Sequence, residues 1–405
     1  MVIKPENAGM CADRLERITH HFETRYIEPR KIAGCQILVQ RRGHTAYHRS
    51  LGYMDLERQK PMRDDTLFRI YSMTKPIASV ALMMLFEEAH FQLKDPVSRY
   101  IPEWKELRVY ESGDDHGNFK TRAPHRPMTL RDTLMHMTGV ATQFGIHPVD
   151  AAFRENLPWA QPGATLQTLI ESLATLPLKF DPGTRWNYGP STDVVARLVE
   201  IFSGQSFDTF LRERIFRPLG MRDTGFFVPE GQHERLGATY GRRRDKTLRT
   251  LDDPATSAFL RPPTYFSGQG GLVSTTADYL RFCEMLLAGG ELEGARILGH
   301  KTLELMTRNH LSGGRDLDAV ALGGFGETAF DGVGFGLGFA VSLGDVATQS
   351  IGANGDYYWG GAASTLFWID PAEDLCVIFM TQFMPSATFN FRGQLRNLVY
   401  SAIES

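Results

Sequence analysis

The sequence has little cysteine and no closely spaced cysteine pair. Its four cysteines, Cys11, Cys35, Cys283 and Cys376, lie far apart among 405 residues. Disulfide frameworks and structural zinc sites need clustered or paired cysteines, and the twelve histidines also show no spacing typical of metal ligands. We therefore predict buried free thiols and expect neither a metal nor a cofactor.

The sequence also lacks an excess of charge of one sign and any long hydrophobic run. The 44 basic and 47 acidic residues nearly cancel, which argues against a nucleic-acid partner, and the short basic run at 241–245 reads as a solvated loop. Nowhere do ~18 apolar residues run uninterrupted, so we expect no membrane span. The first residues lack the apolar core of a secretory signal. We expect a soluble cytoplasmic protein whose partner is a small molecule.

The apolar pattern predicts helices and a hairpin at the front of the chain. Apolar positions recur at helical spacing over 9–26, and residues 32–55 read as two strands joined at Arg42 and Gly43. A long apolar helix follows over 68–92, and its Pro76 is tolerated only in the first turn, where a missing N–H costs nothing. From about 95 to 230 helix signals dominate, with glycine or proline stops.

The last third of the sequence returns to strands. Two further helices over 275–310 precede three segments between 334 and 382 that alternate like antiparallel strands, and a closing helix follows. This order predicts an α+β fold in which both chain ends build one antiparallel sheet flanked by helices. We predict a sandwich lobe from 1–85 and 231–405, a mostly helical lobe from 86–230, and a site between them.

A serine and a lysine three residues apart open the long apolar helix. Ser72 and Lys75 would share one helix face, close to unpaired backbone N–H groups and the positive end of the helix dipole. Burial disfavours the charged form of a lysine, so Lys75 could take the proton of Ser72 and make it a nucleophile. In the alternative, Ser72 only caps the helix and Lys75 extends to the surface.

Five segments in a fixed order resemble the serine β-lactamase and penicillin-binding-protein superfamily, and most closely the family VIII carboxylesterases, which share the fold of class C β-lactamases but cleave simple esters. The segments contain SMTK, LMHMTG, DPGTRWNYGPSTD, GQGGLVSTTADYL and WGGAASTLFWIDP, and they lie at 72–75, 134–139, 181–204, 268–290 and 359–371. The resemblance implies a β-lactamase-like fold with an inserted all-helical lobe. It also implies a nucleophile at Ser72, a catalytic lysine at Lys75 and a proton-shuttling phenol at Tyr188. Whether Lys75 or Tyr188 is the base is left open.

The third motif of the superfamily is altered in this chain. Trp359, Gly360 and Gly361 stand where β-lactamases and peptidases have Lys-Thr-Gly, so the cation that binds a substrate carboxylate is replaced by an apolar face. Pro190 likewise replaces the asparagine that follows the tyrosine in class C enzymes. Both changes favour uncharged substrates. The glycines would let the backbone N–H of Ala362 join that of Ser72 in an oxyanion hole.

These features predict a carboxylesterase that cleaves short-acyl esters through an acyl-enzyme on Ser72. Trp359, Trp186 and Tyr357 are expected to line an apolar substrate pocket. Asp193, five residues after Tyr188, agrees with the esterase variant of the family but reads at least as well as a first-turn helix carboxylate, and His136 reads as a structural residue, so neither enters the catalytic set. An acyltransferase, a weak β-lactamase or D-amino-acid peptidase, and an idle binding protein of the same fold remain as alternatives.

Overall fold

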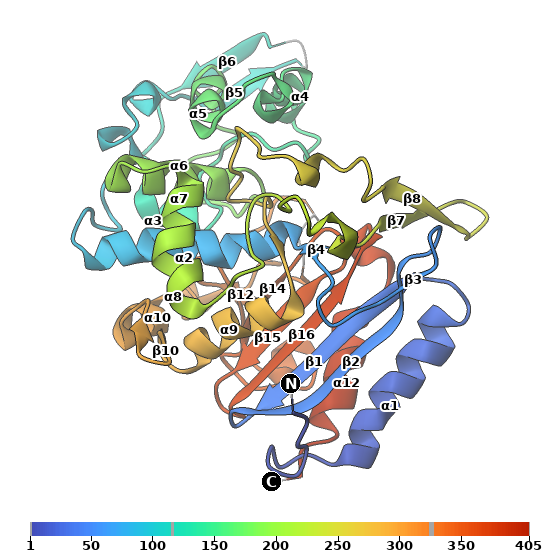
Figure 1. Ribbon diagram of the computed structural model, residues 1–405. Helices are drawn as coiled ribbons and strands as arrows, with labels where there is room; N and C mark the ends of the chain where they lie inside the picture. The colour runs from blue at the N-terminus through green and yellow to red at the C-terminus, as the bar shows by residue number, and fades with distance from the viewer. Residues whose placement is uncertain (1, 115–116, 324–327, 405) are drawn as a thin grey trace.

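The computed structural model describes residues 2–114, 117–323 and 328–404, and its centre is an antiparallel sheet built from both ends of the chain (Figure 1). Within these ranges eight strands follow the order β12-β13-β14-β15-β16-β1-β2-β3. The bounds are β1 (Gly34–Arg41), β2 (His44–Asp55), β3 (Lys60–Pro61), β12 (Val333–Phe335), β13 (Ala340–Ser342), β14 (Tyr357–Gly360), β15 (Leu366–Asp370) and β16 (Leu375–Thr381). The predicted junction of chain ends lies where β1 pairs with β16.

Helices cover both faces of this sheet. Leu366 of β15 pairs with Phe379 of β16, so these two side chains point to the same face of the sheet. The next residue of β15, Phe367, points to the opposite face. Phe379 packs against α1 (Ala12–Phe22) and α12 (Phe391–Tyr400), with ring centroids 5.2 Å from Phe22 and 5.0 Å from Phe391. Phe367 packs instead on Tyr279 of α9 (Thr276–Leu287). The sandwich predicted from sequence is therefore present.

The chain between these sheet segments forms a second group of helices around α2 (Thr74–Glu87). They are α3 (Leu130–Leu134), α4 (Pro148–Glu155), α5 (Leu166–Ala174), α6 (Ser191–Ser203), α7 (Phe207–Leu211) and α8 (Arg217–Leu219). Helix α2 is buried from Thr74 to Leu85, since it lies between this group and the sheet (Figure 1). The lobe division at residues 86 and 230 stays a prediction.

One element of this region was not expected from the sequence. Strands β5 (Val109–Gly113) and β6 (Phe119–Arg122) form an antiparallel hairpin where helix signals dominated the sequence. Val109 is the one buried residue of the two strands. A strand without a buried face leaves no period-two hydrophobic pattern, so no strand signal is visible over these residues.

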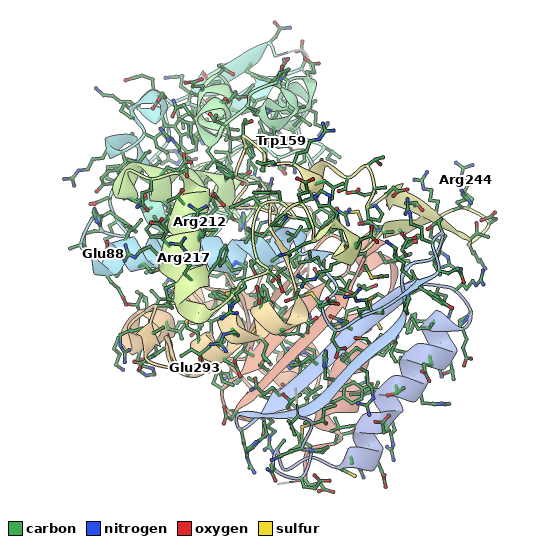
Figure 2. All side chains as sticks on the ribbon, viewed as in Figure 1. Glu88, Trp159, Arg212, Arg217, Arg244 and Glu293 are labelled. Atoms are coloured by element: carbon green, nitrogen blue, oxygen red, sulfur yellow. The ribbon has the colours of Figure 1, made fainter. Side chains whose placement is uncertain are left out.

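Two expectations about the surface can be compared with the structure. The basic run at 241–245 reaches the turn between β7 (Thr239–Arg242) and β8 (Leu248–Asp252), and Figure 2 shows Arg244 pointing away from the molecule at the tip of this hairpin. Residues 243–245 form the exposed turn that was expected, whereas Gly241 and Arg242 belong to strand β7 and Gly241 is buried. In the described part of the chain, every helix is too short or too polar to cross a membrane.

Candidate active site

Ser72 lies in a 3-10 turn, Tyr71–Met73, that runs directly into α2. Pro76 is the third residue of α2, in the first turn as predicted. The residue at the cap position is Met73, and no side chain caps the helix, so the hydroxyl of Ser72 does not serve as a cap. Tyr71, directly before the serine, has a φ of 42°, a left-handed conformation that costs a bulky side chain energy. Such strain is typical of residues held for function.

The side chains of Ser72, Lys75 and Tyr188 meet. Lys75 Nζ donates to Ser72 Oγ at 3.1 Å, and the Tyr188 hydroxyl donates to the same oxygen at 2.7 Å. Lys75 Nζ also lies 4.5 Å from the centroid of the Tyr188 ring. Lys75 is 2% exposed, which rules out the alternative in which it extends to the surface. The hydroxyl oxygen of Ser72 thus receives hydrogen bonds from Lys75, one helical turn away, and from Tyr188, 116 positions away in the sequence.

Lys75 makes a second hydrogen bond, to the backbone of Gln269, which the buried carboxylate of Asp193 holds in place. Lys75 Nζ donates to the carbonyl oxygen of Gln269 at 2.7 Å. Asp193 accepts bonds from the Gln269 N–H at 2.8 Å, and from the hydroxyls of Ser267 and Tyr265 at 2.9 Å each. Burial raises the pKa of Asp193, while these hydrogen bonds and Lys75 act against the rise. Asp193 is absent from the site predicted from sequence; in the structure it holds the segment whose carbonyl meets Lys75.

Aromatic rings pack around Tyr188. The ring centroids of His136, Trp359 and Trp186 lie 5.2, 5.7 and 5.9 Å from that of Tyr188. Burial, together with the charge of Lys75, places the pKa of His136 well below its ordinary 6.5, so this ring is neutral at pH 7. The phenol oxygen is therefore positioned by packing, and no cationic histidine contacts it.

The turn after β14 lies against the segment that leads to the nucleophile. Thr365 Oγ1 donates to the carbonyl oxygen of Ile70 at 3.3 Å, and the Gly361 N–H donates to the Thr365 carbonyl at 2.7 Å. A Cβ on Gly361 would lie 2.4 Å from the Ile70 oxygen, so only glycine allows this approach. The next residue, Ala362, lines the same cavity as Ser72.

The cavity around Ser72 has a volume of about 410 Å³. Its aromatic walls come from Tyr71, Phe144, Trp159 and Tyr265, and Figure 2 labels Trp159 in the helical part of the molecule. The rings of Trp159 and Tyr265 lie 6.2 Å apart. Loops carry most of this wall, and their paths do not follow from a sequence pattern.

The predicted pocket residues lie elsewhere. Trp186, Trp359 and Tyr357 are 0%, 1% and 2% exposed, and the cavity around Ser72 is lined without them. Tyr357 and Trp359 lie on the buried strand β14, and Trp186 lies on the buried segment before Tyr188, so all three are packed in the core. Their burial corrects the expectation that they line the substrate pocket. Gly360 and Gly361 line a separate cavity of about 260 Å³ beside that turn.

Comparison with known proteins agrees with this geometry. A family model described as Beta-lactamase matches residues 20–400. The chain is similar to Lovastatin esterase from Penicillium rubens, with 30% identity over 86% of this chain and 88% of that protein, and to Esterase EstB from Burkholderia gladioli, with 28% identity over 93% and 91%.

A solved structure is similar along nearly the whole length. It is that of EstCE1, a hydrolase with promiscuous acyltransferase activity, and it matches with a TM-score of 0.79 and 25% identity over 96% of this chain and 99% of that one. The family match agrees with the order of the sequence segments. The contacts among Ser72, Lys75 and Tyr188 are consistent with the same family. The chain is therefore an enzyme of the beta-lactamase family, with the fold of that superfamily's esterases and acyltransferases.

Proposed function

We propose that the protein is a carboxylesterase that hydrolyses short-acyl esters of uncharged alcohols through an acyl-enzyme on Ser72. The observation that carries this proposal is the pair of hydrogen bonds that Tyr188 and Lys75 make to Ser72 Oγ inside an aromatic cavity. A hydroxyl with two proton-exchanging neighbours can be deprotonated as it attacks a carbonyl carbon. The esterases among the relatives support the same chemistry.

The proposed reaction has two balanced halves. In the reactive form the Lys75 and Tyr188 pair has lost one proton. Ser72 Oγ then forms a bond to the carbonyl carbon, its proton passes to this pair, and the C=O π electrons move to the oxygen, where the N–H groups of Ser72 and Ala362 stabilise the oxyanion. The bond to the alcohol oxygen then breaks, and Tyr188 gives that oxygen the proton. Water repeats the sequence on the acyl-enzyme and releases the acid. Lys75, held by the Gln269 carbonyl, keeps the site electropositive when negative charge develops.

The chemistry of the site disfavours turnover of charged lactams. Trp359 is fully buried against Tyr188 and Phe335, so the position that carries a cation in β-lactamases offers no charge to a substrate carboxylate. Transfer of the acyl group to an alcohol is the second candidate, because EstCE1, a structural neighbour, is a hydrolase with promiscuous acyltransferase activity. A second alcohol would simply take the place of water.

We further propose a cytoplasmic location, since all four cysteines are free thiols.

Hydrolysis of p-nitrophenyl acetate and butyrate by wild type and Ser72→Ala tests the proposal. We expect the variant to lose at least about 10³-fold in kcat. Equal rates would refute a serine mechanism, and nitrocefin turnover at the esterase rate would refute the substrate class. Added alcohols distinguish the transferase, which would form more transferred ester than free acid.

A further inference from the structure

A second cavity adjoins the cavity of Ser72, and Phe144 and Tyr188 line both of them. It has a volume of about 450 Å³, and we call it the outer compartment. Its further lining residues are Thr142, Gly145, Ile146, His147, Asp150, Lys179, Asn187, Leu322 and Gly323. The rings of Phe144 and Tyr188 stack with centroids 6.2 Å apart, and the two cavities share this pair of rings as a common lining.

The rim of the outer compartment exposes apolar side chains to water. Ile146 is 99% exposed, and Phe144 and Leu322 are 43% and 41% exposed. Single exposed apolar residues are common, but three around one cavity mouth form a surface that an apolar ligand can cover. Covering them would remove apolar area from water, which favours binding.

The floor of the outer compartment is polar and buried. Lys179 Nζ donates to Asp150 Oδ2 at 2.9 Å and to Asn187 Oδ1 at 2.8 Å, and its side chain is 4% exposed. An ammonium has three N–H donors, so within the described residues one N–H of Lys179 remains available for a ligand. His147 Nδ1 accepts from the Val149 N–H, so a neutral ring carries its proton on Nε2. Burial lowers the pKa of His147, with Lys179 acting the same way, which favours that neutral ring. The floor thus offers hydrogen-bond donors beneath an apolar mouth.

We propose that the outer compartment binds the alcohol portion of the ester, and that it selects large apolar alcohols with an acceptor oxygen at the end remote from the ester bond. This inference rests on the proposed esterase function. In that reaction Tyr188 returns the proton to the alkoxy oxygen as the C–O bond breaks, so the alcohol lies on the Tyr188 side of the carbonyl. The outer compartment begins on that side.

The acyl group then occupies the other side. Tyr71, Trp159 and Tyr265 line the Ser72 cavity but not the outer compartment. The two halves of the substrate therefore have separate determinants. Residues of the outer compartment set the alcohol preference, and the aromatic wall sets the acyl length.

Ratios of kcat/KM in two substrate series test the assignment. With the acetyl group fixed, Ile146→Asp should lower the ratio for octyl over ethyl acetate about tenfold. With the ethyl alcohol fixed, the kcat/KM ratio of Ile146→Asp for ethyl octanoate over ethyl acetate should stay within about twofold of the wild-type ratio. Val346→Asp is the matched control, because Val346 is 88% exposed and lines neither cavity.

The remote acceptor is tested on the substrate side. Wild type should prefer 7-oxooctyl acetate to octyl acetate by about tenfold, and Lys179→Met should abolish this preference. If Lys179→Met does not fold because Asp150 is left buried without its partner, the wild-type preference decides alone. Equal wild-type rates with the two esters overturn the polar floor.

The outcomes also separate the two proposals. Ester turnover that survives Ser72→Ala overturns the esterase mechanism and this inference together. Turnover that needs Ser72, with an octyl ratio unchanged in Ile146→Asp or with the acyl ratio lowered instead, overturns the outer compartment alone. A lowered octyl ratio in Ile146→Asp with Val346→Asp at the wild-type ratio supports it.

Discussion

At the scale of single residues, the Tyr188 oxygen is the atom whose role can be separated most cleanly from packing. The ring is held by Trp186, Trp359 and His136, whereas its oxygen bonds to Ser72. Tyr188→Phe removes the oxygen and keeps the ring. We expect kcat for p-nitrophenyl acetate to fall about 10²–10⁴-fold.

The same substitution should leave the fold intact. The melting temperature of Tyr188→Phe should lie within a few degrees of wild type, since one hydrogen bond contributes about 1 kcal/mol. A variant that keeps wild-type kcat would exclude Tyr188 from proton transfer. A variant that loses kcat only because it unfolds would show a large drop in melting temperature and a lost circular dichroism signal.

Sequence reasoning reached these residues unevenly. The spacing of Ser72 and Lys75 and the tolerance of Pro76 indicated a reactive helix start without any structure. Tyr188 came only from the resemblance, because no local rule joins residues 116 positions apart. The role of Asp193 was missed, since a carboxylate in the first turn of α6 has a simpler explanation in the sequence. Its true partners lie on 265–269, which only the fold brings near.

At the scale of elements, the turn between β14 and β15 lies against the backbone segment that precedes Ser72. Gly361→Ala would place a Cβ 2.2 Å from Thr365 Oγ1 and 2.4 Å from the Ile70 carbonyl oxygen. The turn must move away from the segment before Ser72, which would displace the Ala362 N–H from the oxyanion. We expect kcat to fall about 10²-fold or more, the cost of one lost oxyanion donor.

Gly225→Ala is the control for this prediction. A Cβ at Gly225 would meet its nearest neighbour at 3.8 Å, an ordinary contact. This variant should keep kcat within about twofold of wild type. If both alanine variants behave alike, the close approach at Gly361 does not position the oxyanion donor.

The unexpected hairpin is joined to the segment that carries Tyr188. Asp181 accepts from both terminal nitrogens of Arg122 at the end of β6 and from the His125 N–H. The Arg122 hydrogen bonds, with those of His125, lower the pKa of Asp181 to about 2. Since the unfolded pKa is about 3.9, the ionised form stabilises the fold above pH 4. That stability is lost as the pH falls from about 4 to about 2.

Asp181→Asn should therefore destabilise the protein by about 1 kcal/mol at pH 7, a modest value because Arg122 is partly open to solvent. The difference in unfolding free energy from wild type should narrow as the pH falls from 5 to 3. Urea unfolding at several pH values measures it. Asp318→Asn, at an exposed residue, serves as the control. A difference that stays constant over this pH range would contradict the pairing.

The first hairpin, β1 and β2, followed from the sequence because its strands carry buried apolar residues. The turn of Arg42 and Gly43 joins β1 and β2 as expected, with positive φ at both residues, 53° and 72°. The hairpin of β5 and β6 did not follow, because its strands are largely exposed. The walls of the Ser72 cavity did not follow either, since Phe144, Trp159 and Tyr265 lie on connections whose paths depend on tertiary packing.

At the scale of the whole molecule, the first and last thirds of the chain build one sheet (Figure 1), and residues 9–11 lie beside residues 402–404. The Cys11 N–H donates to the Ala402 carbonyl at 2.8 Å, and the Glu404 N–H donates to the Gly9 carbonyl at 3.1 Å. The site depends on this arrangement, because β14, from the last fifth of the chain, packs beside the turn of Ser72. The pairing of β1 with β16 thus joins the part of the chain that carries Ser72 to the part that carries β14.

A circular permutant tests whether chain continuity through the centre of the sheet governs assembly of the site. With residues 405 and 1 joined by a short Gly/Ser linker and new ends opened in the exposed turn at Arg244, the pairing of β1 with β16 is kept. We expect this permutant to keep kcat/KM for p-nitrophenyl acetate within about threefold of wild type. Opening the chain between β15 and β16 instead separates two adjacent central strands and should abolish soluble, active protein. If the two permutants fare equally, chain continuity through the centre of the sheet does not govern assembly of the site.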